Sequence, residues 1–305
     1  MTLNSLRLVF RLSRPLFLLG GVLNYFLGVG IARYLGNPID GGALVLGQVW
    51  VTAMQLSTHY LNEYFDFPTD AGNRNRTPFT GGSGVLGREP GKLRPRIALY
   101  AAVFALTAVS LATYGLARQG AINSTILAIM VLGFLGAFFY SVPPARLSSS
   151  GFGELTTSIL LANLVPAFGF VLQMGGLHRL LAMTTFPLTA LTLASMLALE
   201  FPDYASDLKV GKRTLFVRLG WQNAIRVHHA FILSAYILFG TALVQGLPAA
   251  IGLPVFLTLP LALLQVWYIN RIGAGLKPNW TALTLNGLVF TAASAYLMTY
   301  AFWTR

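Results

Sequence analysis

Residues 62–70 read Asn-Glu-Tyr-Phe-Asp-Phe-Pro-Thr-Asp, and residues 200–207 read Glu-Phe-Pro-Asp-Tyr-Ala-Ser-Asp. Both stretches contain the pattern Glu-x-x-Asp-x-x-x-Asp, and each acid of the first has its counterpart 137 residues later. Together they hold six of the nine acidic residues in a chain of 305. A repeated spacing of this kind is most simply explained by an internal duplication.

Each acidic motif ends a long apolar stretch. Only 10% of the residues are charged, whereas about 25% is usual in a soluble domain. Stretches without Asp, Glu, Lys or Arg cover 15–32, 41–62, 97–117, 119–145, 155–178, 180–199, 227–270 and 278–304. A bilayer is crossed by roughly 20 apolar residues, and the turn-like residues 245–248 divide the longest stretch into two. The sequence therefore predicts an all-α, polytopic membrane protein with nine transmembrane helices, residues 1–305 forming one domain.

The distribution of basic residues predicts the topology. When loops are numbered alternately from the N-terminus, 17 of the 21 Lys and Arg residues fall on one side. The positive-inside rule places that side, with the N-terminus and both acidic motifs, in the cytoplasm and the C-terminus outside. We expect a retained first span, since no small-residue cleavage site follows it. Topology thus explains the net charge of +12 without any need for a nucleic-acid partner. We expect the protein to lie in the inner membrane.

The first motif predicts a polar face on an otherwise apolar helix. Spacings of three, four and seven residues put side chains on one helical face, so Glu63, Asp66 and Asp70 can point into one cavity. Pro68 favours an earlier end of the helix, which affects Asp70 most. The same periodicity extends the polar stripe inward through Gln55, His59, Asn62 and Asp66, and we expect this stripe to face the protein interior.

The clustered carboxylates predict a bound cation, because neighbouring acids repel one another unless positive charge neutralises them. Sites made of oxygen ligands suit hard cations, and magnesium binds through a few carboxylates together with phosphate oxygens of a substrate. The chain has no cysteine, which excludes thiolate chemistry. Basic residues close to the motifs would complement a diphosphate: Arg74, Arg76, Lys212 and Arg213.

At these motifs the sequence resembles the UbiA-type superfamily of intramembrane aromatic prenyltransferases. Its first motif, Asn-Asp-x-x-Asp-x-x-x-Asp, is matched with Glu63 in place of the second residue, and its second, Asp-x-x-x-Asp, is matched by Asp203 and Asp207. The resemblance implies helices around a central cavity with the acidic motifs at its cytoplasmic mouth. It implies Mg²⁺ ligands among Asn62, Glu63, Asp66, Asp70, Glu200, Asp203 and Asp207.

Three further segments resemble the 1,4-dihydroxy-2-naphthoate branch of this superfamily. They are Tyr140–Leu147 followed by Gly151-Phe152-Gly153-Glu154, Gly211–Leu215, and the glycine-rich Gly81–Leu86. Many relatives have Tyr-x-x-x-Lys at the first of these segments, and this chain does not. Arg146 either supplies the missing cation or anchors the loop by the positive-inside rule.

The resemblance implies a magnesium-dependent transfer from an isoprenoid diphosphate to an aromatic acceptor, with loss of carbon dioxide when the acceptor is the naphthoate. The residues expected to act on the reacting groups are Asp66, Asp70, Asp203, Asp207 and Arg146. Those expected to bind substrates are Asn62, Lys212, Arg213, Arg74, Arg76, Tyr140 and His59. For His59, the plainer interpretation is a buried histidine whose hydrogen bond is made to a neighbouring residue.

Other functions remain open at this point. The acceptor could instead be 4-hydroxybenzoate or another aromatic compound. A cation-coupled transporter would also carry intramembrane acids and internal repeats, although transporter sites usually lie at the bilayer midplane. A CDP-alcohol phosphotransferase shares Asp-x-x-x-Asp, but its Asp-Gly-x-x-Ala-Arg sequence is absent here.

Overall fold

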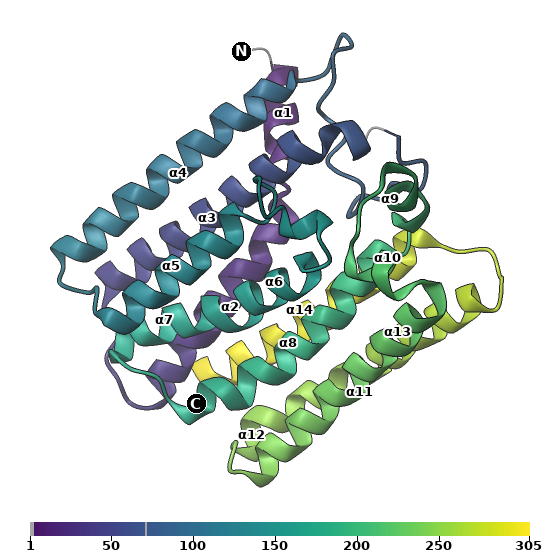
Figure 1. Ribbon diagram of the computed structural model, residues 1–305. Helices are drawn as coiled ribbons and strands as arrows, with labels where there is room; N and C mark the ends of the chain where they lie inside the picture. Colours follow the sequence, from purple (N-terminus) through teal and green to yellow (C-terminus); the bar gives the residue numbers. More distant parts are fainter. Residues whose placement is uncertain (1–2, 71) are drawn as a thin grey trace.

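The computed structural model describes residues 3–70 and 72–305. These residues form helices joined by loops (Figure 1). Within them the extended pairing amounts to one isolated bridge, between Leu86 and Leu93. The α-helices are α1 (Leu3–Leu12), α2 (Pro15–Tyr34), α3 (Gly41–Asp70), α4 (Pro95–Arg118), α5 (Ser124–Phe138), α6 (Gly153–Ile159), α7 (Val165–Met174), α8 (Arg179–Glu200), α9 (Tyr204–Val210), α10 (Leu215–Leu219), α11 (Trp221–Val244), α12 (Ala249–Gly252), α13 (Leu259–Gly273) and α14 (Trp280–Trp303). Short turns of other helix types are η1 (Leu147–Ser149), η2 (Leu160–Leu164) and η3 (Leu253–Thr258).

Seven helical segments of the described residues are long and apolar enough to cross a membrane. They are Pro15–Tyr34, Pro95–Arg118, Gly153–Met174, Arg179–Glu200, Trp221–Val244, Ala249–Gly273 and Trp280–Trp303. The other two expected spans coincide with α3, whose apolar surface is interrupted by the polar stripe, and with α5, which is only 15 residues long. The all-helical prediction is confirmed, and the count of nine spans stays a prediction.

The long helices lie side by side, and α1, α9, α10 and the long loop between α3 and α4 lie at one end of the bundle (Figure 1). α3 packs on α4, α8 on α11, and α2 on α7 and α14. α2 and α7 approach very closely at Gly28, where an added Cβ atom would lie 1.8 Å from the Pro166 carbonyl oxygen. Small residues permit such close backbone contact between membrane helices.

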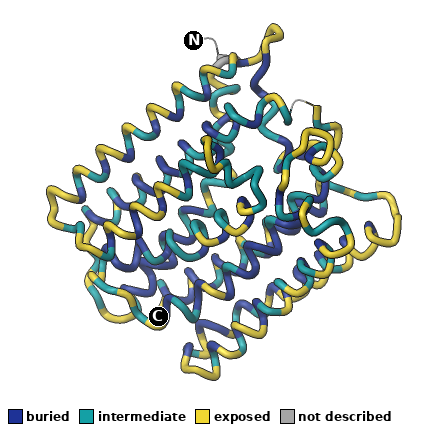
Figure 2. Tube along the Cα trace, in the orientation of Figure 1, coloured by how far each residue is buried: buried dark blue, intermediate teal, exposed yellow. Residues whose placement is uncertain are grey.

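Buried residues line the inner faces of the helices, while the outer faces are exposed and apolar (Figure 2). Phe104 is 79% exposed and Val244 is 89% exposed. So large an exposed apolar surface is unfavourable in water and suits contact with lipid chains.

The two acidic motifs fold differently. α3 continues through Pro68 to Asp70, so the earlier helix end that Pro68 favoured does not occur. The second motif instead crosses a helix break, because α8 ends at Glu200 and α9 begins at Tyr204. Gly211, at φ 73°, then ends α9 in the left-handed conformation that glycine adopts without strain. This turn brings Lys212 back toward Asp207, whose carbonyl oxygen accepts the Lys212 N–H.

Candidate active site

A cavity of about 580 Å³ opens among α2, α3, α6, α8 and α14. Its polar end is lined by both acidic motifs, and its depth by apolar side chains such as Leu23, Met54 and Phe168. Gln55, His59, Asn62 and Asp66 all line this cavity, so the polar stripe faces the interior as its periodicity predicted. The cavity therefore joins a charged mouth to an apolar interior.

Asp66 is the buried centre of the first motif. Its Oδ2 atom accepts a hydrogen bond of 2.9 Å from the Asn62 side-chain amide, which also contacts the Ser141 hydroxyl at 3.3 Å. Its Oδ1 atom has no hydrogen-bond partner and lies 3.6 Å from an Arg146 guanidinium nitrogen. One oxygen of this buried carboxylate therefore has no hydrogen-bond donor, although Arg146 pairs with it electrostatically.

Lys212 joins the two motifs. Its ammonium nitrogen lies 3.2 Å from Asp66 Oδ2, 3.6 Å from Asp70 Oδ1 and 3.9 Å from Asp207 Oδ1. Burial lowers the pKa of Lys212, but the three carboxylates outweigh this effect and hold that pKa above its ordinary value. The ammonium group is therefore the cation that both motifs share.

The second motif is less completely neutralised. Asp203 accepts a hydrogen bond of 2.6 Å from the Asn73 side-chain amide. Burial, with the nearby charge of Asp207, raises the pKa of Asp203 to about 7. Burial raises the pKa of Asp207 to about 6, against the opposing effect of Lys212. Both carboxylates are therefore poised to lose protons when more positive charge arrives.

Glu63 lies apart from the shared cluster. Its Oε1 atom accepts hydrogen bonds from the Arg14 Nε at 2.9 Å and the Ser83 backbone N–H at 2.6 Å, and its Oε2 from the Ser83 hydroxyl at 2.7 Å. Glu63 does not line the cavity, although Gly81 and Gly82 of the same loop do. Glu63 was expected among the metal ligands, but here it fastens the glycine-rich loop to α3 and to the α1–α2 junction.

The remaining expected residues separate into two groups. Tyr140, His59 and Glu200 line the cavity, and His59 Nδ1 lies 3.1 Å from the Ser13 carbonyl oxygen. This contact agrees with the plainer interpretation of a satisfied buried histidine.

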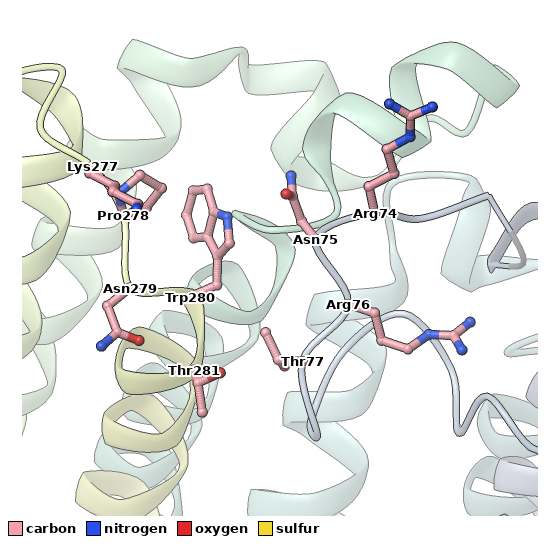
Figure 3. Close-up of a pocket in the computed structure, with 9 residues that line it drawn as sticks. All are labelled: Arg74, Asn75, Arg76, Thr77, Lys277, Pro278, Asn279, Trp280 and Thr281. Carbon is pink, nitrogen blue, oxygen red and sulfur yellow. The ribbon is translucent and has the colours of Figure 1, made fainter.

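The basic residues Arg74, Arg76 and Arg213 do not line the main cavity. Arg74 and Arg76 border a separate shallow pocket with residues 277–281, and their guanidinium groups point away from each other (Figure 3). The Arg76 guanidinium donates to the Asp70 carbonyl oxygen at 2.9 Å, and the Arg213 backbone N–H donates to Ser149. Of the four basic residues expected at the diphosphate, Lys212 alone is brought between the motifs.

Three residues at the site carry no role predicted from the sequence: Glu154, Arg14 and Asn73. Glu154 lies in the first turn of α6, lines the cavity, and accepts a hydrogen bond of 2.8 Å from the Leu215 N–H. A signal for Glu154 was present, because it is the one acid between the two motifs that borders an apolar stretch. Arg14 and Asn73 carry no comparable pattern.

The donor set of the cluster fits a hard divalent cation. No group of three or more acidic or histidine side chains within the described ranges is close enough to hold a metal as it stands. The reason is geometric, since the Lys212 ammonium group lies among the carboxylates. All the side-chain donors are oxygens, as magnesium prefers, and the unpartnered Oδ1 of Asp66 offers a first ligand.

Comparison with known proteins assigns the class of this molecule. Residues 22–286 match the UbiA prenyltransferase family, and the chain belongs to that family. It is an integral membrane enzyme and a prenyltransferase, which sets aside the transporter and CDP-alcohol phosphotransferase alternatives.

Two relatives share the same description, 1,4-dihydroxy-2-naphthoate octaprenyltransferase. The protein from Bacillus subtilis (strain 168) is 24% identical over 262 residues, 83% of this chain and 79% of the relative. The protein from Mycobacterium leprae (strain TN) is 26% identical over 294 residues, 95% of each.

Solved structures show the same fold. A UbiA homolog from Archaeoglobus fulgidus bound to GPP and Mg²⁺ has a TM-score of 0.66 at 18% identity and covers 94% of this chain and 98% of its own. The apo UbiA homolog from Aeropyrum pernix K1 has a TM-score of 0.63 at 15% identity, with 93% and 96% covered. The predicted resemblance is therefore confirmed at the level of family and fold.

Proposed function

We propose that this enzyme transfers a prenyl group from an isoprenoid diphosphate to an aromatic acceptor, with magnesium bound between the two acidic motifs. The observation that carries the proposal is the placement of both motifs around one ammonium group at the mouth of an apolar cavity. Homologous structures described as bound to GPP or DMAPP and Mg²⁺ support it.

The residues that would hold magnesium are those that face the shared cluster. These are Asn62, Asp66, Asp70, Asp203 and Asp207, with Glu200 beside them. When bound, magnesium neutralises the diphosphate and so makes it a better leaving group. Glu63 is left out of this set because both its oxygens are already occupied.

The side chains of the protein contribute binding, orientation and exclusion of water. Lys212 is placed to move from the carboxylates to diphosphate oxygens as a point charge, and Arg146 adjoins the same carboxylate of Asp66. The apolar depth of the cavity holds the isoprenoid chain and excludes water that would quench an allylic cation.

The proposed acceptor is 1,4-dihydroxy-2-naphthoate, as in menaquinone biosynthesis. In this reaction the ring carbon that bears the carboxylate bonds to C1 of the prenyl group as the C1–oxygen bond to diphosphate breaks. Carbon dioxide then leaves, and the electron pair of its bond restores aromaticity. Arg146 is the proposed partner of the acceptor carboxylate, with the diphosphate as its alternative. The names of both relatives support this acceptor, and 4-hydroxybenzoate is the second candidate.

The enzyme is proposed to lie in the cell's inner membrane, with the N-terminus and the active site on the cytoplasmic side. The 17 to 4 asymmetry of basic residues supports this orientation. A reporter fused after Arg305 should report an external C-terminus, and a cytoplasmic signal would overturn the orientation.

The acceptor is tested by incubating purified protein with one isoprenoid diphosphate, magnesium and a panel of aromatic acids, with products identified by mass. We expect a naphthoate product that is lighter than the simple adduct by one carbon dioxide. A prenylated 4-hydroxybenzoate that keeps its carboxylate, without any naphthoate product, would contradict the proposed acceptor but not the diphosphate site.

A further inference from the structure

Glu154 is a buried acid that the proposed reaction has not yet used. It is only 4% exposed, in the first turn of α6, and lines the cavity together with Tyr140 and Thr157. Its Oε1 atom accepts a hydrogen bond of 2.8 Å from the Leu215 backbone N–H. Its Oε2 atom is buried and has no hydrogen-bond partner. The side chain is therefore held in place by one oxygen and unsatisfied at the other.

An unsatisfied buried carboxylate oxygen is costly, because it has lost water without gaining a donor. Ion pairing does not relieve the cost, since none of the ion pairs among the described residues includes Glu154. Two acids, Asp207 and Glu200, interact with it electrostatically. Glu154 is itself an acid, so its unpartnered oxygen suits an uncharged hydrogen-bond donor such as a hydroxyl group.

We propose that Glu154 is an acceptor-binding residue, whose Oε2 atom receives a hydrogen bond from a ring hydroxyl of the aromatic substrate. This inference rests on the proposed function and names the chemistry that its acceptor must have. Because Glu154 is itself an acid, a carboxylate of the acceptor would lie away from it, toward Arg146, its proposed partner. A carboxylate that accepts from the ring hydroxyl also stabilises positive charge that develops on that oxygen as the ring attacks.

The chain offers a closely matched variant, Glu154→Gln. The amide oxygen can still accept from the Leu215 N–H, whereas the amide nitrogen replaces the free oxygen with a donor. We expect the KM for a hydroxylated acceptor to rise roughly 10- to 100-fold, the range for losing a hydrogen bond to a charged group. The KM for the isoprenoid diphosphate should stay within about twofold, because that site does not include Glu154.

A methyl-ether analogue of the acceptor gives a readout that a purely structural role would not move. The wild-type enzyme should discriminate strongly against the ether, which has no hydrogen to donate. Glu154→Gln should lose or invert this discrimination, because its amide can donate to the ether oxygen. Glu89→Gln, an acid of the loop after α3 that lies outside the cavity, is the matched control and should behave as wild type.

The outcomes separate this inference from the proposed function. A wild-type enzyme that prenylates no aromatic compound would remove the function itself. An active wild type, together with unchanged acceptor KM and unchanged ether discrimination in Glu154→Gln, would overturn the role of Glu154 alone. If the variant does not fold, labelling of wild-type Glu154 with a hydrophobic carbodiimide decides: the hydroxylated acceptor should protect this residue and the ether should not. Equal labelling with and without the acceptor would contradict the inference.

Discussion

The two acidic motifs have the same spacing but different surroundings. The first lies on one unbroken helix, α3, and three cations contact its acids: Arg14 at Glu63, Arg146 at Asp66, and Lys212 at Asp66 and Asp70. The second crosses the break between α8 and α9, and its one cationic contact among the described side chains is Lys212, 3.9 Å from Asp207. Equal spacing in the sequence has therefore produced one half-site whose acids are paired with protein cations and one whose acids largely lack such partners.

This difference indicates how the site responds to its ligands. In the first half, side-chain cations already pair with the acids. In the second, burial raises the pKa of Asp203 to about 7 and that of Asp207 to about 6. Protons occupy the place of a cation there, so arrival of magnesium must release them.

The largest expected effect is on turnover when either half loses a central acid. Asp66→Asn and Asp203→Asn should each lower kcat by about 100-fold or more, because both remove charge that stabilises the leaving diphosphate. Their effects on stability should differ: without metal, Asp66→Asn should lower the Tm by removing a partner of Lys212, and Asp203→Asn should raise it. Steady-state kinetics and thermal unfolding in detergent measure both. Near-normal turnover in both variants would refute the shared site.

The second prediction is a pH dependence that arises from the second half. An acid whose pKa is raised on folding stabilises the protein fully below its unfolded value, near 4, and this contribution is lost as the pH rises through 6 to 7. The metal-free protein should therefore lose stability over this window. Magnesium should bind more tightly over the same window, and its half-saturating concentration should fall by about tenfold between pH 6 and 8. Asp203→Asn should weaken the pH dependence of both the stability and the magnesium affinity. An unchanged pH dependence in that variant would assign the titration to other groups.

The third prediction concerns the cation that the halves share. Lys212→Met should lower the Tm of the metal-free protein, because three carboxylates lose their common partner. It should also tighten magnesium binding several-fold, since the ammonium group no longer competes for the same oxygens. Lys209→Met, on the exposed side of α9, is the control. Weaker magnesium binding in Lys212→Met would show that Lys212 does not compete with the metal.

The smallest effect should come from Glu63, which the sequence pattern groups with the metal ligands. Glu63→Gln should lower kcat only about threefold to tenfold, because the amide keeps an acceptor for Ser83 and loses only the charged pair with Arg14. Glu63→Asp should restore part of this loss. A defect as large as that of Asp66→Asn would instead make Glu63 a metal ligand.

Sequence patterns predicted the helices and much of the site, because both depend on local spacing. The polar stripe through Gln55, His59, Asn62 and Asp66 predicted which face of α3 lines the cavity, and the structure confirms it. The spacing could not show that Glu63 turns toward Ser83, since this depends on a loop twenty residues away. The placement of Lys212 among the acids likewise depends on the turn at Gly211.

The central claim is that both motifs act together on one magnesium–diphosphate complex. It is tested most directly by following the consumption of geranyl diphosphate by the purified enzyme with 1,4-dihydroxy-2-naphthoate, with and without a chelator, in wild type, Asp66→Asn and Asp203→Asn. The account predicts magnesium-dependent formation of a prenylated product in wild type and almost none in either variant or with the chelator. Equal product formation with the chelator, or in one of the two variants, would contradict it.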